Sequence, residues 1–216
     1  MLSREDYLAA WSRWHGGAVT DRGLVRVWLS AVHALARPIA WIPPIVVTAL
    51  GLGVTCLAVV PAAAGGRWLV VSAVLIGLSG LLDSLDGALA IGTGRASRRG
   101  FVLDSAVDRL TEVGYAAALW CAGAPGPLAA AFAALCWLPD YLRARAGQAG
   151  VTEIGTLSVW ERPTRVILAG LTLVGAWVVS GLGWAGPVVV AGCAAGVALG
   201  VVAVVQLGIG LRRLLG

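Results

Sequence analysis

The sequence has 216 residues, of which 59% are hydrophobic and 12% charged, and its mean hydropathy is +0.87. These values exclude an ordinary soluble domain and indicate an integral membrane protein. The net charge of +5 comes from sixteen arginines and no lysine, set against eleven acidic residues. Because these charges are scattered, they do not predict binding to nucleic acid. The four cysteines lack CxxC spacing, which argues against a zinc site or a disulfide framework.

The first 37 residues mix aromatic and aliphatic side chains with charges. This pattern predicts an amphipathic helix lying in the membrane interface, with a break at Gly16 and Gly17; a solvated tail is the alternative. Charges such as Glu5 and Asp6 interrupt any apolar run that could serve as a cleavable signal peptide, so we expect this segment to be retained. The predicted organisation is therefore an interfacial segment, 1–37, followed by a transmembrane domain, 38–216.

Uncharged runs predict the membrane spans, because a charge near the bilayer centre is costly. Two spans are expected at 45–63 and from 68 to 82, two more between 112 and 140 with a Gly/Pro break at 122–127, and two between 166 and 211 with a break at 181–187. The expected fold class is thus all-α, with six transmembrane helices preceded by the amphipathic interfacial helix.

The arginines predict the orientation of the helices. If both termini are cytoplasmic, only Arg67 lies outside. The absence of lysine together with abundant Ala, Gly and Val is typical of a GC-rich bacterial genome. We therefore expect a multi-pass protein of a bacterial inner or plasma membrane.

Four aspartates lie where the predicted membrane helices should still be running, and this costly placement requires a reason. Asp83 and Asp86 are three residues apart, and Asp104 and Asp108 are four residues apart. On a helix each pair projects from one face at successive turns. The short segment 92–100 makes the two helices an antiparallel hairpin, so we expect all four carboxylates to meet near the cytoplasmic face.

Oxygen ligands without neighbouring His or Cys favour Mg²⁺, Mn²⁺ or Ca²⁺ over zinc or copper, and two divalent ions would balance four negative charges. A proton or cation relay in a transporter is the alternative use of such residues. Gly87 and Gly100 lack side chains and would let a phosphate or nucleotide approach the backbone. Arg95, Arg98 and Arg99 either hold phosphate oxygens or only set the membrane topology.

These residues resemble the signature of the CDP-alcohol phosphotransferases, also called CDP-alcohol phosphatidyltransferases, which reads D-x2-D-G-x2-A-R-x8-G-x3-D-x3-D. The matching residues are Asp83, Asp86, Gly87, Ala90, Gly100, Asp104 and Asp108. Every spacing matches, and the single departure is Ile91, where the family has arginine. Arg95 or Arg98, one or two turns further along, is a candidate replacement for that arginine. The predicted helix count, cytoplasmic site and N-terminal interfacial helix are also similar to the family.

The resemblance implies an enzyme that transfers the phosphatidyl group from CDP-diacylglycerol to an alcohol and releases CMP, in phospholipid biosynthesis. It implies that Asp83, Asp86 and Asp104 hold two Mg²⁺ or Mn²⁺ ions, and that Asp108 both binds metal and acts as general base. The residues expected at the CDP-lipid are Asp83, Asp86, Gly87, Ala90, Arg95, Arg98 and Gly100. A homodimer is also implied, and Gly/Ala-rich spans permit close helix contact.

A second charged group lies at the predicted ends of helices four and five, where several arginines favour an acceptor that carries a phosphate. The expected acceptor-binding residues are Arg143, Arg145, Arg162 and Arg165. The runs from Tyr141 and from Glu161 resemble the phosphatidylinositol-phosphate synthase branch, which implies inositol phosphate as acceptor. Glycerol 3-phosphate is the alternative acceptor, and a carboxylate-lined cation transporter is the alternative of another class. Glu112 is expected either to tune the site or to pair with an arginine such as Arg109.

Overall fold

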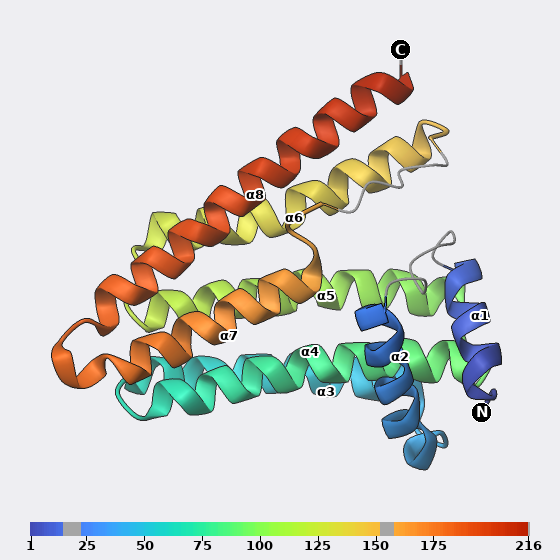
Figure 1. The fold of residues 1–216 in the computed structure, drawn as a ribbon, viewed down its shortest axis with the longest axis horizontal. Coiled ribbons are helices and arrows are strands. Elements are labelled where there is room, and N and C mark those ends of the chain that lie inside the picture. Colours follow the sequence, from blue (N-terminus) through green and yellow to red (C-terminus); the bar gives the residue numbers. More distant parts are fainter. Residues whose placement is uncertain (15–22, 152–157, 216) are drawn as a thin grey trace. The chain divides into compact units, whose positions relative to one another are not determined.

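A computed structural model describes residues 1–14, 23–151 and 158–215, and this part of the chain consists of helices and short connections, with no strand. Two shorter helices come first, α1 (Arg4–Trp14) and α2 (Gly23–Ala36) (Figure 1). Six longer helices follow, namely α3 (Pro44–Ala64), α4 (Trp68–Gly92), α5 (Arg98–Cys121), α6 (Gly126–Gln148), α7 (Arg162–Val178) and α8 (Ala185–Leu215). Short 3-10 turns, η2 (Arg37–Ile39) and η3 (Ser180–Leu182), follow α2 and precede α8. The prediction of an all-helical protein is confirmed.

The longer helices are separated where Gly and Pro interrupt the apolar runs. Between α3 and α4, Gly65 and Gly66 have φ values of +66° and +52°, in the left-handed region that favours glycine. Pro125 precedes the first residue of α6 and restricts the backbone at that break. The break at Pro125 divides the apolar run between 112 and 140 into the end of α5 and the start of α6, as expected.

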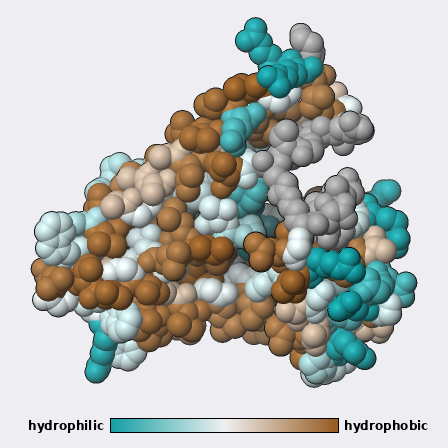
Figure 2. Space-filling model, viewed as in Figure 1, coloured by the Kyte–Doolittle hydropathy of each residue, from teal (hydrophilic) through white to brown (hydrophobic). Residues whose placement is uncertain are grey.

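Membrane crossing is supported by length and composition for three helices of the described chain, α3, α4 and α8. Of the other long helices, α5 and α6 carry more charged residues, among them Asp104 and Asp108 in α5, and α7 has only 17 residues. Hydrophobic side chains cover much of the visible face of α7 and α8, whereas hydrophilic side chains gather over α1 and at the C-terminal end of α8 (Figure 2). Several membrane helices are thus supported, and six spans stay a prediction.

The chain forms two compact units, each with its own core. Unit 1 comprises Met1–Gly53 and Leu78–Asp108, and unit 2 comprises Val54–Gly77 and Arg109–Gly216. The helices α3, α4 and α5 therefore contribute one part to each unit. The two units are defined by packing alone. The expected boundary between an interfacial segment, 1–37, and a membrane domain, 38–216, therefore stays a prediction.

The N-terminal helices help to build the core of unit 1. Its buried members are Tyr7, Leu8, Leu29, Val32, Ala36, Val47, Leu85, Ala88 and Leu89. The sequence predicts an amphipathic interfacial helix over the first 37 residues with a break at Gly16 and Gly17. The structure has two helices there, both of which contribute buried side chains, and their placement at the membrane interface stays a prediction. Gly16 and Gly17, where a break was expected, lie outside the described residues.

Three glycines of α8, spaced four residues apart, allow close packing in unit 2. A Cβ at Gly196 would overlap the ring of Phe132 in α6, and a Cβ at Gly200 would lie 2.6 Å from Cβ of Leu135 in the same helix. A Cβ at Gly192 would likewise overlap the side chain of Thr172 in α7. Small residues let membrane helices approach closely enough for van der Waals packing to hold them together.

Replacing Gly196 by leucine should lower the thermal stability of the detergent-purified protein, because overpacking typically costs about 1–3 kcal/mol. Gly208→Leu is the matched control on the same helix, since no atom lies within 4 Å of its Cβ position. Thermal unfolding followed by size-exclusion chromatography measures both variants. Equal melting temperatures for the two variants would contradict close packing at Gly196.

Candidate functional site

A short turn, 93–97, joins the two helices that carry the aspartates. The helix α4 ends where Gly94 adopts a φ of +68°, and the N–H of Arg95 bonds back to a carbonyl of α4 at 2.9 Å. The helix α5 is capped by Ser97, whose Oγ accepts a hydrogen bond from the N–H of Gly100 at 3.0 Å. The turn thus makes the end of α4 and the start of α5 antiparallel neighbours within unit 1.

Three of the four aspartates converge from these helices. Asp83 of α4 and Asp104 and Asp108 of α5 each offer a carboxylate oxygen, and these oxygens lie within 4.8 Å of one another. All three residues are half-buried. We call these three residues the carboxylate group.

Asp86 is buried in unit 1 but is not a member of the carboxylate group. Residues three apart on a helix point in directions that differ by about 60°, so Asp86 does not project exactly as Asp83 does. The structure therefore brings together three of the four aspartates that the sequence predicts at one site.

The carboxylate group fits a divalent cation. Three carboxylate oxygens, without His or Cys in the group, form a hard donor set that suits Mg²⁺, Mn²⁺ or Ca²⁺. Without a cation, three negative charges at this separation repel one another. The carboxylate group could therefore hold a divalent cation in this part of unit 1.

The predicted CDP-lipid residues occupy different surroundings in unit 1. Gly87 lies against the indole ring of Trp11: a Cβ at position 87 would be 3.5 Å from Cζ3 of that ring. The guanidinium of Arg95 donates to the backbone carbonyls of Trp41 and Ile42, at 3.4 and 3.2 Å. Arg98 is exposed, and Ala90 is partly buried. The contact of Trp11 could not be read from the sequence, because no spacing rule relates α1 to α4.

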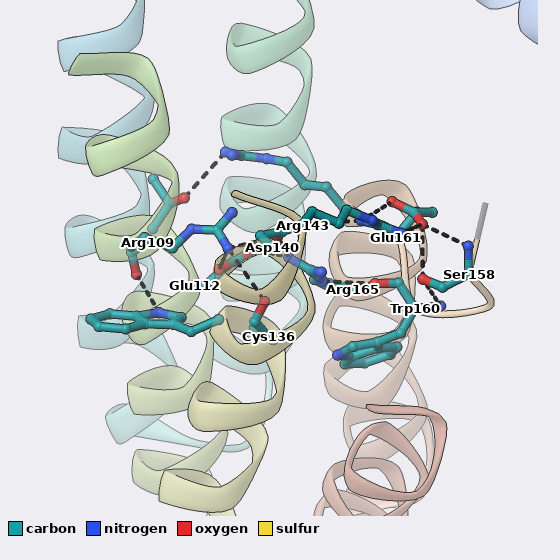
Figure 3. Close-up of polar contacts among 12 residues, drawn as sticks. Arg109, Glu112, Cys136, Asp140, Arg143, Ser158, Trp160, Glu161 and Arg165 are labelled. Carbon is teal, nitrogen blue, oxygen red and sulfur yellow. Dashed lines mark hydrogen bonds and ion pairs between the residues drawn. The ribbon is translucent and has the colours of Figure 1, made fainter. Parts of the chain in front are cut away.

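A network of arginines and carboxylates lies in unit 2 (Figure 3). The guanidinium of Arg165 is 1% exposed and forms an ion pair with the side chain of Glu112, which is fully buried. Arg165 Nη1 also lies 2.9 Å from Asp140 Oδ2, and its Nε donates to the carbonyl of Trp160 at 3.0 Å. Arg109 Nη1 reaches the same Asp140 oxygen at 2.6 Å and Glu112 at 3.3 Å. Glu112 thus pairs with two arginines.

Arg143 lies at a less buried position in this network. Its Nη1 is 3.0 Å from Asp140 Oδ1, and its Nη2 is 2.5 Å from Glu161 Oε1. Glu161 is in turn held by the N–H and the hydroxyl of Ser158, each at 2.8 Å. Arg143 is therefore oriented by two carboxylates while its side chain keeps 21% of its exposure.

The two other predicted acceptor-binding arginines differ from each other. Arg162 is half-buried and donates to Thr111 Oγ1 at 3.2 Å. Arg145 is exposed and donates to Gln148 Oε1 at 2.7 Å. Of the four predicted acceptor-binding arginines, one is therefore exposed, two are half-buried and one, Arg165, is buried.

Comparison with known proteins identifies the family. The CDP-alcohol phosphatidyltransferase family model matches residues 35–204, which is most of the chain. The chain belongs to the CDP-alcohol phosphatidyltransferase family. This confirms the resemblance read from residues 83–108 and favours the enzyme over the cation transporter. A family of membrane enzymes and the apolar helices together indicate a multi-pass membrane protein.

Two proteins that are similar to this chain are named as synthases. The chain is 40% identical over 113 residues to the archaetidylinositol phosphate synthase of Aeropyrum pernix, covering 50% of this chain and 58% of that relative. It is also similar to the crystal structure of the Mycobacterium tuberculosis phosphatidylinositol phosphate synthase with CDP-DAG bound. That likeness has a TM-score of 0.66 and 25% identity, and covers 83% of this chain and 92% of the other.

Glu112→Ala should destabilise the protein strongly, because it leaves the buried charge of Arg165 without its closest partner. Removing one member of a buried ion pair typically costs about 3–5 kcal/mol. Replacing both residues, by Glu112→Leu and Arg165→Met, should recover much of this loss, because no isolated charge then remains. Thermal unfolding in detergent tests the pair, and a double variant no more stable than Glu112→Ala would contradict this account.

Proposed function

We propose that this protein transfers the phosphatidyl group from CDP-diacylglycerol to inositol phosphate and releases CMP. The observation that carries this proposal is the carboxylate group, because its three aspartates all belong to the family signature and converge. The related crystal structure with CDP-DAG bound supports CDP-diacylglycerol as donor. The two relatives are named archaetidylinositol phosphate synthase and phosphatidylinositol phosphate synthase, and these names support inositol phosphate as the acceptor.

Asp83, Asp104 and Asp108 are proposed to hold divalent cations, Mg²⁺ or Mn²⁺, with Asp86 as the fourth ligand for a pair of ions. A bound cation supplies charge neutralisation of the pyrophosphate and of the departing CMP. The residues proposed to bind the CDP-lipid are Asp83, Asp86, Gly87, Ala90, Arg95, Arg98 and Gly100. The absence of a side chain at Gly100 allows the nucleotide to approach the backbone there, whereas at Gly87 the indole of Trp11 lies against the backbone.

Asp108 is proposed to act as the general base. Its carboxylate accepts the proton of the acceptor hydroxyl, and the hydroxyl oxygen attacks the phosphorus that carries the diacylglycerol. A new phosphorus–oxygen bond forms to the acceptor while the bond from the same phosphorus to the bridging oxygen breaks. The electron pair of that bond leaves with CMP.

Arg143 and Arg162 are the residues that we propose to hold the acceptor phosphate, because both are half-buried and retain some exposure. Guanidinium groups bind phosphate oxygens through charged, often bidentate hydrogen bonds. Arg165 is proposed to position this group through Glu112 and Asp140, since its own guanidinium is buried between them. Arg145 is proposed as an outer contact, because it is exposed.

The membrane arrangement is proposed from the charge pattern. We propose six spans, with residues 1–37 at the interface and 38–216 forming the membrane domain. Both termini and the carboxylate group are placed at the cytoplasmic face of a bacterial cell membrane, since this leaves only Arg67 outside. A homodimer is proposed from the family and from the Gly/Ala-rich helices, which allow close packing.

The proposed function predicts Mg²⁺- or Mn²⁺-dependent release of CMP when purified protein receives CDP-diacylglycerol and inositol phosphate. Asp108→Asn should abolish release with every acceptor, because base catalysis alone is worth about 10² to 10⁴ in rate. Arg143→Ala should chiefly raise the KM for inositol phosphate, by roughly tenfold to a hundredfold, since a charged hydrogen bond is lost. Arg212→Ala, at the exposed end of α8, is the control.

Different outcomes separate the alternatives. Faster release with glycerol 3-phosphate than with inositol phosphate would assign the acceptor to glycerol 3-phosphate. A weaker affinity of Arg143→Ala for the CDP-lipid, with acceptor dependence unchanged, would move Arg143 to the nucleotide side. Full CMP release by both variants would contradict the assignment of chemistry to these residues.

A further inference from the structure

The indole ring of Trp11 in α1 lies directly against the backbone of Gly87 in α4. Its Cζ3 and Cη2 atoms are 3.5 and 3.6 Å from the position of a Cβ at Gly87, which is ordinary van der Waals contact. Trp11 is only partly buried. Its indole therefore packs on α4 while part of the ring stays exposed. Trp11 also lies outside the residues matched by the family, 35–204.

The start of the chain is fixed to α4 and α2 by polar and aromatic contacts. The N–H of Leu2 donates to the carbonyl of Gly92 at 2.7 Å, and the carbonyl of Leu2 lies 3.0 Å from His33 Nε2. The fully buried ring of Tyr7 stacks on His33 at 4.9 Å between centroids and lies 6.0 Å from the ring of Trp11. Trp11 is therefore held in position by the fold of unit 1 itself.

Gly87 shares a helical face with Asp83, one turn earlier, and with Ile91, one turn later. Four residues advance about 6 Å along a helix, so Trp11 contacts α4 about one turn beyond the carboxylate group. The helix α4 is apolar before Asp83 and approaches the polar turn after Gly92. A CDP-lipid with its pyrophosphate at the carboxylate group would direct its acyl chains along the apolar part and its nucleotide toward Gly87.

We propose that Trp11 forms one wall of the nucleotide site and stacks on the cytosine base of the CDP-lipid. This inference rests on the proposed function and adds to it a residue that no signature position supplies. Aromatic rings bind bases by stacking, and this contact requires no charge. The chain has Ile91 where the family has arginine, and Ile91, like Trp11, packs against the buried apolar residues of unit 1. A stacked indole is thus a contact that this face can offer a nucleotide in place of a charged one.

The test compares two ligands that differ only in the base and its glycosidic bond, CMP and ribose 5-phosphate. Binding to the purified full-length protein is measured by calorimetry in detergent with Mn²⁺ present. Trp11→Leu should weaken CMP binding by about tenfold, because leucine fills space against Gly87 but cannot stack. Ribose 5-phosphate binding should not change. Trp11→Phe should keep most of the CMP affinity, and Trp14→Ala, more exposed on the same helix, should match the unaltered protein.

Three results would overturn the role of Trp11 while leaving the proposed function intact. These are unchanged CMP affinity in Trp11→Leu, an equal loss of affinity for CMP and ribose 5-phosphate, and tighter CMP binding. The second result would mean that α1 only supports the fold, and the third that the indole blocks the site. Absence of CMP binding by the unaltered protein would overturn the proposed function together with this inference.

Discussion

Electrostatic repulsion among three carboxylates held within 4.8 Å of one another is the constraint on which the proposed site depends. Charges of one sign repel more strongly where burial lowers the effective dielectric. The short turn at Gly94 and the cap at Ser97 keep α4 and α5 in register, so the helices hold these side chains together. A divalent cation bound between them removes the repulsion. The hairpin therefore holds a group of carboxylates that could bind a divalent cation.

Unit 2 meets the same problem by a different route. Its buried Glu112 and its partly buried Asp140 are neutralised by guanidinium groups of the protein itself, above all by Arg165. These carboxylates thus have fixed partners within the chain. Arg143 is oriented by the same network but is less buried, which suits a residue that exchanges a carboxylate partner for a phosphate. In the proposed function, the carboxylates of unit 1 bind cations and the arginines of unit 2 bind the acceptor phosphate.

Much of the fold could be predicted because it depends on local signals. Uncharged runs broken by Gly and Pro predict the longer helices, and the i,i+4 spacing of Asp104 and Asp108 predicts their shared face. Asp86 is different, because convergence across two helices depends on their relative rotation. The partners of Arg165 could not be read from spacing either, since several carboxylates were available to it. The N-terminal segment was expected to be an amphipathic helix broken at Gly16 and Gly17, but its packing into the core of unit 1 through two helices could not be predicted from local pattern.

The most direct test of a cation-binding carboxylate group is electron paramagnetic resonance of Mn²⁺ added to purified protein. Asp104→Asn removes one ligand charge, and Asp6→Asn makes the same change of charge at an exposed position in α1. The account predicts that the unaltered protein and Asp6→Asn bind Mn²⁺ with the same affinity, competed by Mg²⁺, and that Asp104→Asn binds it much more weakly. Equal Mn²⁺ affinity in Asp104→Asn and Asp6→Asn would contradict the account.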